Sequence, residues 1–152
     1  MTRSAFHAGE RARTPSAVRR LAWFRYRLRR FLRFSERVTR SHGITPQQYL
    51  LLLGIAGYTG RGWATISELA EFLQERHNGV VGLVKRAEGR ELVEKIQSTQ
   101  DRRYVRVRLS RKGAPLLRRL VDLHLRELRR LQFPPGSALP GRPRFLRAAR
   151  NA

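Results

Sequence analysis

The chain has 152 residues, which is long enough for one domain with a hydrophobic core and short flanking arms. Lys and Arg number 33 against 11 Asp and Glu, so the formal net charge is +22. Charge of this size opposes compact folding unless a polyanion screens it, which favours nucleic acid as a partner. A hydrophobic content of 41% excludes a disordered basic tail, so the charge must lie on a folded body.

The sequence contains no cysteine, which excludes disulfides, thiolate metal sites and thiol-based redox sensing. Its longest apolar run, residues 49–56, is far shorter than the roughly 20 residues that span a bilayer. The N-terminus is not followed by the apolar segment of a signal peptide. We therefore expect a cytoplasmic, nucleoid-associated protein without membrane contact.

Residues 1–15 are polar and basic and show no apolar periodicity, so we expect them to form a flexible basic arm. From residue 16, apolar side chains recur at steps of three and four, which predicts a long amphipathic helix ending near residues 41–43. Trp23, Tyr26 and Phe34 widen its apolar surface beyond a single stripe. A dimer interface and ordinary core packing both explain this excess.

The next predicted helix begins at Thr45. A Thr N-cap, Pro46 at the first helical position and Gln48 at the third form a helix-start pattern. Residues 49–56 are apolar on almost all sides, which indicates a helix that is buried on most faces. Gly57 and the glycines after it end this helix, and residues 63–64 are too few to assign to an element.

A helix-turn-helix is predicted next. Thr65 or Ser67 is expected to cap a short helix that ends before residues 74–76. The helix that follows has an apolar side, formed by Val80, Leu83, Val84 and Ala87, and a polar side. Two short helices joined by a tight turn are the skeleton of this motif.

Residues 92–96 and 105–109 are predicted strands, since apolar and polar side chains alternate in the second and a polar, basic segment joins the two. A hairpin in this position is the wing of a winged helix. Ser110 is expected to cap a last long amphipathic helix, which stops at Pro134.

The predicted fold class is therefore mainly α with a small β wing (α+β). A winged helix-turn-helix core at residues 45–113 lies within one domain, residues 16–133, whose first and last helices are long. The tail at residues 134–152 is a candidate part of a dimer interface.

Three motifs are the most specific part of the sequence: Ser67-Glu68-Leu69-Ala70, Leu92-Val93-Glu94, and Asp101-Arg102-Arg103 with the Val-x-Leu-Ser-x-x-Gly run that ends at Gly113. With the order of elements over residues 17–132, they resemble the MarR family, the multiple antibiotic resistance regulators. The resemblance implies a bacterial transcription regulator, usually a repressor. It also implies an obligate homodimer with interleaved terminal helices that binds double-stranded DNA.

In this family the second helix of the motif enters the major groove and a wing arginine enters the adjacent minor groove. By resemblance, Arg103 is the minor-groove ligand, Asp101 positions the wing and Arg102 contacts phosphate. His77 and Asn78 are our candidates for base contacts, since Asn reads adenine through two hydrogen bonds. The alternative for Asn78 is an N-cap.

The remaining candidates on this helix have simpler roles. Val81 is placed to touch a thymine methyl group. Phosphate contacts, which position the protein without specifying sequence, are assigned to Arg76, Lys85 and Arg86.

The same helix departs from the family pattern. Gly79 and Gly82 stand where relatives have larger residues, and each interior Gly costs roughly 1 kcal/mol relative to Ala, which predicts a soft recognition helix. Lys85 replaces a common acidic residue and Glu91 replaces the usual helix-ending Gly. The base preference of relatives therefore does not transfer to this chain.

No catalytic or metal site is predicted. No Ser-His or paired-carboxylate arrangement has suitable spacing, and the four histidines are scattered. His124 lies near the apolar stripe of the last helix, where a core or interface role is favoured over metal binding. We expect a protein without enzyme activity and without a cofactor.

Relatives bind small aromatic or phenolic acids between the dimerisation helices and the winged lobe. The resemblance implies such an effector site, with arginines of the first helix holding a carboxylate and an aromatic lining of Trp23, Tyr26, Tyr49 and Tyr58. Core packing is the alternative role for each of these residues.

Two other functions stay open. An architectural DNA-binding or RNA-binding protein uses the same fold with little sequence preference, and both the net charge and the soft recognition helix favour it. The other is a protein-interaction dimer with residual DNA binding. The ratio of specific to non-specific affinity at fixed salt separates the first from a regulator.

Overall fold

A computed structural model describes residues 8–97 and 105–133, with side chains described from residue 16 to 96 and from 105 to 133. Its elements in chain order are α1 (Ala8–Ser41), α2 (Pro46–Leu53), η1 (Gly54–Tyr58), β1 (Trp63–Thr65), α3 (Ile66–Leu73), α4 (His77–Gly89), β2 (Val93–Gln97), β3 (Val105–Leu109) and α5 (Gly113–Arg130). This mostly helical chain with a small antiparallel sheet confirms the predicted fold class.

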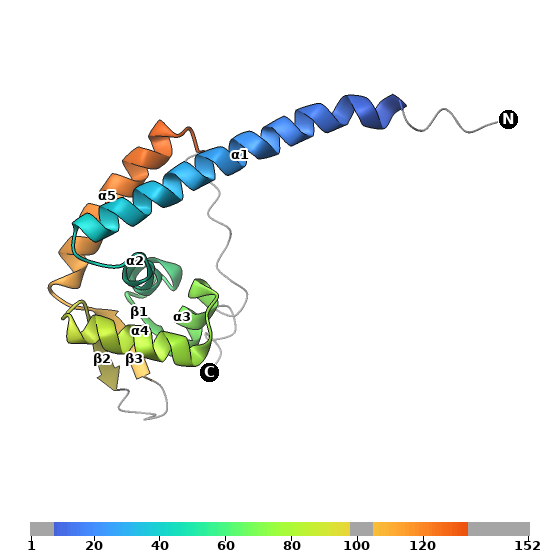
Figure 1. Ribbon diagram of the computed structural model, residues 1–152. Coiled ribbons are helices and arrows are strands. Elements are labelled where there is room, and N and C mark those ends of the chain that lie inside the picture. The colour runs from blue at the N-terminus through green and yellow to red at the C-terminus, as the bar shows by residue number, and fades with distance from the viewer. Residues whose placement is uncertain (1–7, 98–104, 134–152) are drawn as a thin grey trace.

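The elements form two groups. Figure 1 shows α1 and α5 side by side, and α3, α4 and the sheet on the other side of α2, which packs against α1, α4 and α5. The core fills the space around α2 with aliphatic side chains that are fully buried, among them Leu51, Leu52, Ile55, Val84 and Leu120. The recognition motif therefore stands on the same core as the two long helices.

Helix α1 begins at Ala8, so the described part of the predicted flexible arm is helical. Ala, Glu and Arg, which are good helix formers, dominate residues 8–13, and the helix runs through Gly9 and Pro15. The helix ends at Ser41, as predicted. Gly43, with φ +78°, lets the chain turn into α2.

Helix α2 begins with the predicted capping box. The Thr45 hydroxyl accepts from the backbone N–H of Gln48, whose side chain accepts from the backbone N–H of Thr45. The helix continues into the wider turns of η1, where a Cβ on Gly54 would lie 2.7 Å from the Phe72 ring. Glycine at this position therefore lets α3 pack closely against η1.

The sheet has the order β1-β3-β2, and both pairings are antiparallel. Its short strand β1 pairs Trp63 with Arg108 and Thr65 with Arg106, and this partner lies more than forty positions later in the chain. A two-residue pattern cannot reveal such a pairing, which is why the sequence left it unassigned. The N-cap of α5 is Lys112, so the prediction that Ser110 occupies this position is wrong. The Ser110 hydroxyl nevertheless accepts hydrogen bonds from the backbone N–H groups of Lys112 and Gly113 at the start of the helix.

Arg90, directly after α4, joins the two groups of elements. Its guanidinium donates to the Gly43 carbonyl and to the Gln48 side chain. The end of α4 is thereby attached to the turn between α1 and α2.

His124 is a core residue on α5, as favoured by the sequence. Its Nδ1 lies 2.7 Å from the Leu120 carbonyl and its Nε2 lies 2.9 Å from the Ser35 hydroxyl of α1. The ring stacks on Tyr49, with centroids 4.4 Å apart, and meets the edges of two α1 phenylalanines, Phe31 and Phe34. Because the Leu120 carbonyl only accepts, Nδ1 carries the proton and neutral Nε2 accepts from Ser35.

Acidification is expected to destabilise the protein through His124. Burial lowers the pKa of His124 below its ordinary value of 6.5, against the opposing effect of the Leu120 carbonyl. The unfolded chain therefore binds this proton first, and the free energy of unfolding falls as the pH drops below about 6.5. Chemical denaturation at pH 7.5 and pH 5.5 should show a smaller loss for His124→Gln than for the wild type.

The control is His77→Gln, which removes an exposed histidine. This variant should retain the wild-type loss of stability on acidification. Equal losses in the wild type and His124→Gln would contradict the assignment.

Candidate nucleic-acid interface

Helix α4 separates an inner side from an outer side. Val80, Leu83, Val84 and Ala87 are buried against the core, which confirms the predicted apolar side. Every predicted contact residue of the motif itself is exposed: Arg76, His77, Asn78, Val81, Lys85 and Arg86. The inner contacts hold the helix in place while the outer side chains stay free for a partner.

The start of α4 removes one alternative. The N-cap of this helix is Arg76, and Asn78 lies within its first turn, so the interpretation of Asn78 as an N-cap is wrong. At 100° per residue, Asn78, Val81 and Lys85 share one face of the helix. The Asn78 amide is thus free to contact an external group.

The wing begins beside α4 with β2 and β3. Three predicted contact residues, Asp101, Arg102 and Arg103, lie outside the described residues. At the described base, Lys95 pairs with Glu88 at 2.9 Å. Arg108 pairs with Glu94, also at 2.9 Å. These cations already have carboxylate partners.

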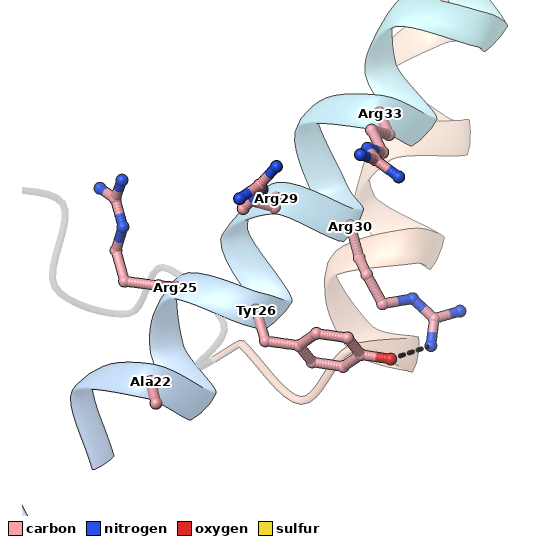
Figure 2. A pocket seen from close by; sticks show the side chains of 6 residues that line it. All are labelled: Ala22, Arg25, Tyr26, Arg29, Arg30 and Arg33. Atoms are coloured by element: carbon pink, nitrogen blue, oxygen red, sulfur yellow. Dashed lines mark hydrogen bonds between the residues drawn. The ribbon is translucent and has the colours of Figure 1, made fainter. Parts of the chain in front are cut away.

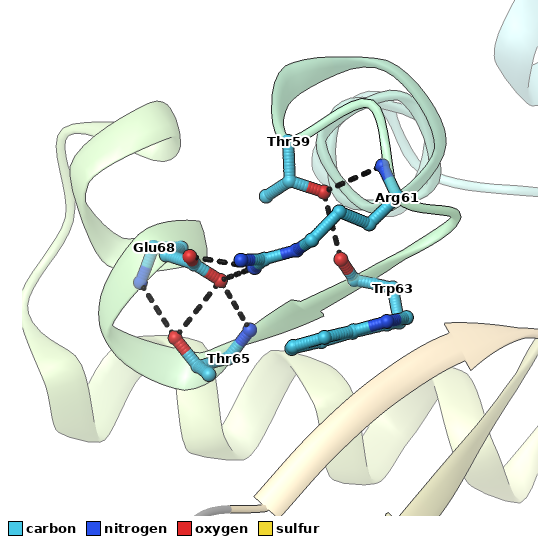
Figure 3. A network of polar contacts seen from close by, with 5 residues as sticks. All are labelled: Thr59, Arg61, Trp63, Thr65 and Glu68. Atoms are coloured by element: carbon cyan, nitrogen blue, oxygen red, sulfur yellow. Dashed lines mark hydrogen bonds and ion pairs between the residues drawn. The ribbon is translucent and has the colours of Figure 1, made fainter. Parts of the chain in front are cut away.

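A polar network that the sequence did not predict fixes the start of α3 (Figure 3). Arg61 donates to both carboxylate oxygens of Glu68 at 2.6 Å, and Glu68 also accepts from the backbone N–H of Thr65. The Thr59 hydroxyl donates to the Trp63 carbonyl at 2.7 Å. The Thr-x-x-Glu spacing of Thr65 and Glu68 predicts a capping box, but no sequence pattern predicts that Arg61 pairs with Glu68.

The Trp63 ring joins this network to the sheet. The Arg61 guanidinium lies 3.9 Å from the ring centroid, and that of Arg106 lies 4.4 Å from it. Cation–π contacts of this kind contribute roughly 0.5–1 kcal/mol at exposed sites. Since Arg106 belongs to β3, the first helix of the motif and the base of the wing are held together.

Residues 42–103 match the model of the MarR family. This segment, from the end of α1 to the wing, is therefore similar to the MarR family. No curated protein sequence matches the chain.

Three solved structures illustrate the likeness of fold. AbsC, a MarR family transcriptional regulator from Streptomyces coelicolor, is 23% identical, with a TM-score of 0.60 over 86% of this chain and 82% of AbsC. A MepR variant from Staphylococcus aureus, bound to an oligodeoxyribonucleotide, is 20% identical, with a TM-score of 0.61 over 71% of this chain and 78% of MepR. The MarR family regulator SP03579 is 20% identical, with a TM-score of 0.69 over 80% and 78% of the two chains.

The glycines that depart from the MarR family pattern are not required by packing. A Cβ on Gly79 would meet its nearest atom at 3.9 Å, and one on Gly82 would meet only the flexible end of Arg86. Helix α4 nevertheless continues through both positions. The expected softness of the recognition helix thus remains a prediction from helix propensity.

Glu91, which replaces the helix-ending Gly of the MarR family, has φ +59°. This left-handed conformation costs a non-glycine residue roughly 1–2 kcal/mol. The ion pair of Glu91 with Lys112, at 3.4 Å between side chains that are 81% and 62% exposed, returns little of it. Glu91→Gly should raise the free energy of unfolding by about 1 kcal/mol in urea denaturation.

Glu91→Ala is the matched control. It removes the carboxylate but keeps the left-handed penalty, so it should not stabilise the protein. The same gain from both substitutions would show that the carboxylate, rather than the backbone, is responsible.

The four aromatic residues predicted for an effector site lie in three places of the protomer. Trp23 and Tyr26 are exposed and meet edge to face, with centroids 5.6 Å apart. Tyr49 is buried against His124, and burial raises the pKa of Tyr49 to about 12. Tyr58 donates to Glu71 at 3.3 Å. A site within one protomer therefore involves the α1 aromatics rather than all four.

Among the described residues, no group of three or more His, Asp or Glu side chains is placed to hold a metal ion. Within the same ranges, no helix has the length and hydropathy that crossing a membrane requires.

Proposed function

We propose that the chain is a homodimeric, sequence-specific DNA-binding transcription regulator that acts as a ligand-responsive repressor. The exposed outer face of α4, opposite a fully buried inner face, carries this proposal. The match of residues 42–103 to the MarR family supports it, and so does the oligodeoxyribonucleotide bound to a MepR variant of similar fold.

On this proposal α4 lies in the major groove. His77 and Asn78 contact base edges and Val81 contacts a thymine methyl group. Arg76, Lys85 and Arg86 contact phosphates on either side.

The wing completes the contact. Arg103 enters the narrow adjacent minor groove, where the negative potential is concentrated. Asp101 positions the wing tip and Arg102 contacts phosphate. Since Lys95 of β2 pairs with Glu88 of α4, the base of the wing and the recognition helix approach DNA as one unit.

Exposed apolar side chains support the homodimer. On α1, Phe24 is 45% exposed, and on α5, Leu125 is 46% exposed. Large apolar side chains gathered on two neighbouring helices mark an interaction surface. A second copy covering them gives the interleaved α1 and α5 helices of the proposed dimer.

The effector site is proposed beside Trp23. A groove of about 500 Å³ there is lined by Ser16, Arg19, Arg20, Trp23 and Arg27. The Nε atom of Arg27 is buried and has no hydrogen-bond partner among the described residues. An aromatic acid would stack on Trp23 and place its carboxylate against these guanidinium groups. Binding there would change the separation of the two α4 helices of the dimer.

The test is binding to the DNA upstream of the protein's own gene. Fluorescence anisotropy at fixed salt should give an affinity at least about 1,000-fold tighter than for a scrambled duplex of the same composition. Equal affinities would contradict sequence-specific regulation. They would instead favour the architectural or RNA-binding alternative, which the net charge of +22 makes the second candidate.

A further inference from the structure

A ladder of three arginines runs along α1. Arg25, Arg29 and Arg33 follow each other at steps of four, so they project from successive turns about 6 Å apart (Figure 2). All three are exposed, and none forms an ion pair within the part of the chain that the structure describes. Ala22, Tyr26 and Arg30 complete the lining of a groove of about 420 Å³ beside them.

The arginine ladder faces away from α5. Phe31 and Ser35 of α1 contact His124 of α5, so they mark the packed side of α1. Arg29 and Arg33 each stand two residues from Phe31, which is about 200° around the helix. The arginine ladder therefore stays accessible while α1 and α5 are packed together.

Carboxylates of this chain cannot balance the charge of α1. Between residues 16 and 35 there are seven arginines and no Asp or Glu. A second copy brings the same net charge of +22, and of its 11 carboxylates only five are left outside the ion pairs of the described residues. The six already paired are Glu36, Glu68, Glu88, Glu91, Glu94 and Glu127. The arginine ladder therefore has no carboxylate partner among the described residues, and its density of positive charge favours a polyanion as its partner.

The arginine ladder and the recognition helix lie on different sides of the molecule. Figure 1 shows this part of α1 beyond α2, while α4 and the sheet lie on the opposite side of α2. A duplex that follows α4 in its groove therefore does not run along the arginine ladder. A guanidinium group can donate two parallel hydrogen bonds to the oxygens of one phosphate. A row that consists of arginines alone, without amide or hydroxyl side chains, therefore favours contact with a phosphate backbone over contact with base edges.

We propose that the arginine ladder binds the phosphate backbone of a second DNA duplex, without regard to sequence. One dimer then holds a first duplex through its α4 helices and a second duplex through α1, and so bridges two DNA segments. The first of these contacts rests on the proposed function. The second is a separate binding surface.

The test is a two-duplex capture experiment with the full chain. A duplex of the protein's own upstream sequence is immobilised and saturated with protein, and a labelled duplex of random sequence is added. The wild type should retain the labelled duplex. The variant Arg25→Gln/Arg29→Gln/Arg33→Gln should retain at least about tenfold less, while its affinity for the immobilised duplex stays within about threefold.

The matched control is Arg118→Gln/Arg119→Gln/Arg126→Gln, which removes the same charge from three exposed arginines of α5. The control should capture the second duplex as the wild type does, and light scattering should give the wild-type mass for both variants. If both variants retained less of the second duplex by the same factor, net charge alone would explain its capture, and the proposal would be overturned. Capture of anionic phospholipid vesicles in place of the second duplex would also overturn it.

The two proposals fail in distinguishable ways. A wild type that binds the immobilised duplex and captures no second duplex overturns the bridging proposal alone. A wild type that binds no duplex of either kind overturns both.

Discussion

Replacing Gly113 with alanine is expected to lower the free energy of unfolding by about 3 kcal/mol or more. Gly113 begins α5, and a Cβ there would lie 2.0 Å from the carbonyl oxygen of Leu92. That carbonyl accepts from the backbone N–H of Ser110, and Ser110 in turn holds the first N–H of α5. Relief of the clash therefore displaces α5 from the sheet. Urea denaturation at one fixed protein concentration measures the effect, since dimerisation contributes to stability.

Gly89→Ala is the control for Gly113→Ala. A Cβ on Gly89, at the end of α4, would have no atom within 4 Å, and the residue has no left-handed φ. Its substitution should change stability by less than about 1 kcal/mol, in the stabilising direction. An equally small effect at Gly113 would mean that the start of α5 moves freely relative to β2.

Charge reversal on the recognition helix, Lys85→Glu/Arg86→Glu, is expected to weaken DNA binding by about 100-fold or more. Both side chains are exposed on α4, and the dimer carries each substitution twice. Loss of each phosphate contact should also reduce the slope of log affinity against log salt by about 0.9. Anisotropy titrations of the upstream duplex over a range of salt concentrations measure both quantities.

Arg25→Glu/Arg29→Glu provides the control with the same change in charge. These residues lie on α1, on the other side of α2 from α4. Their substitution should lower affinity for a single duplex only a few fold, through the long-range field. If both double variants lose affinity equally, the net charge of the protein, and not the face of α4, determines binding.

Local patterns in the sequence were sufficient for the elements with strong periodicity or caps. The capping box of Thr45 and Gln48, the buried side of α4 and the strand at residues 105–109 all follow from neighbouring residues. Strand β1 does not, because Trp63 pairs with Arg108 across the sheet. The start of α1 at Ala8 was also missed, since Gly9 and Pro15 outweighed the helix formers around them in the prediction.

Some features of the candidate site could likewise be predicted from the sequence and others could not. The exposed positions of α4 followed from helical spacing and from the resemblance to the MarR family. The Arg61–Glu68 pair was not predictable, because it joins a loop to a helix across seven positions through side-chain geometry alone. The aromatic residues of the expected effector site were grouped because all are aromatic, but they lie in different parts of the protomer. Tyr49, for example, is part of the core beside His124.

Arg90 couples the position of α4 to the turn between α1 and α2. Because this one guanidinium joins the end of α4 to both Gly43 and Gln48, a rotation of α4 relative to the corner between α1 and α2 would break two hydrogen bonds. In a dimer built on α1, the distance between the two α4 helices would then depend on the angle at which the paired α1 helices cross. A change in that angle would be transmitted through the turn at Gly43 to the position of α4 on DNA.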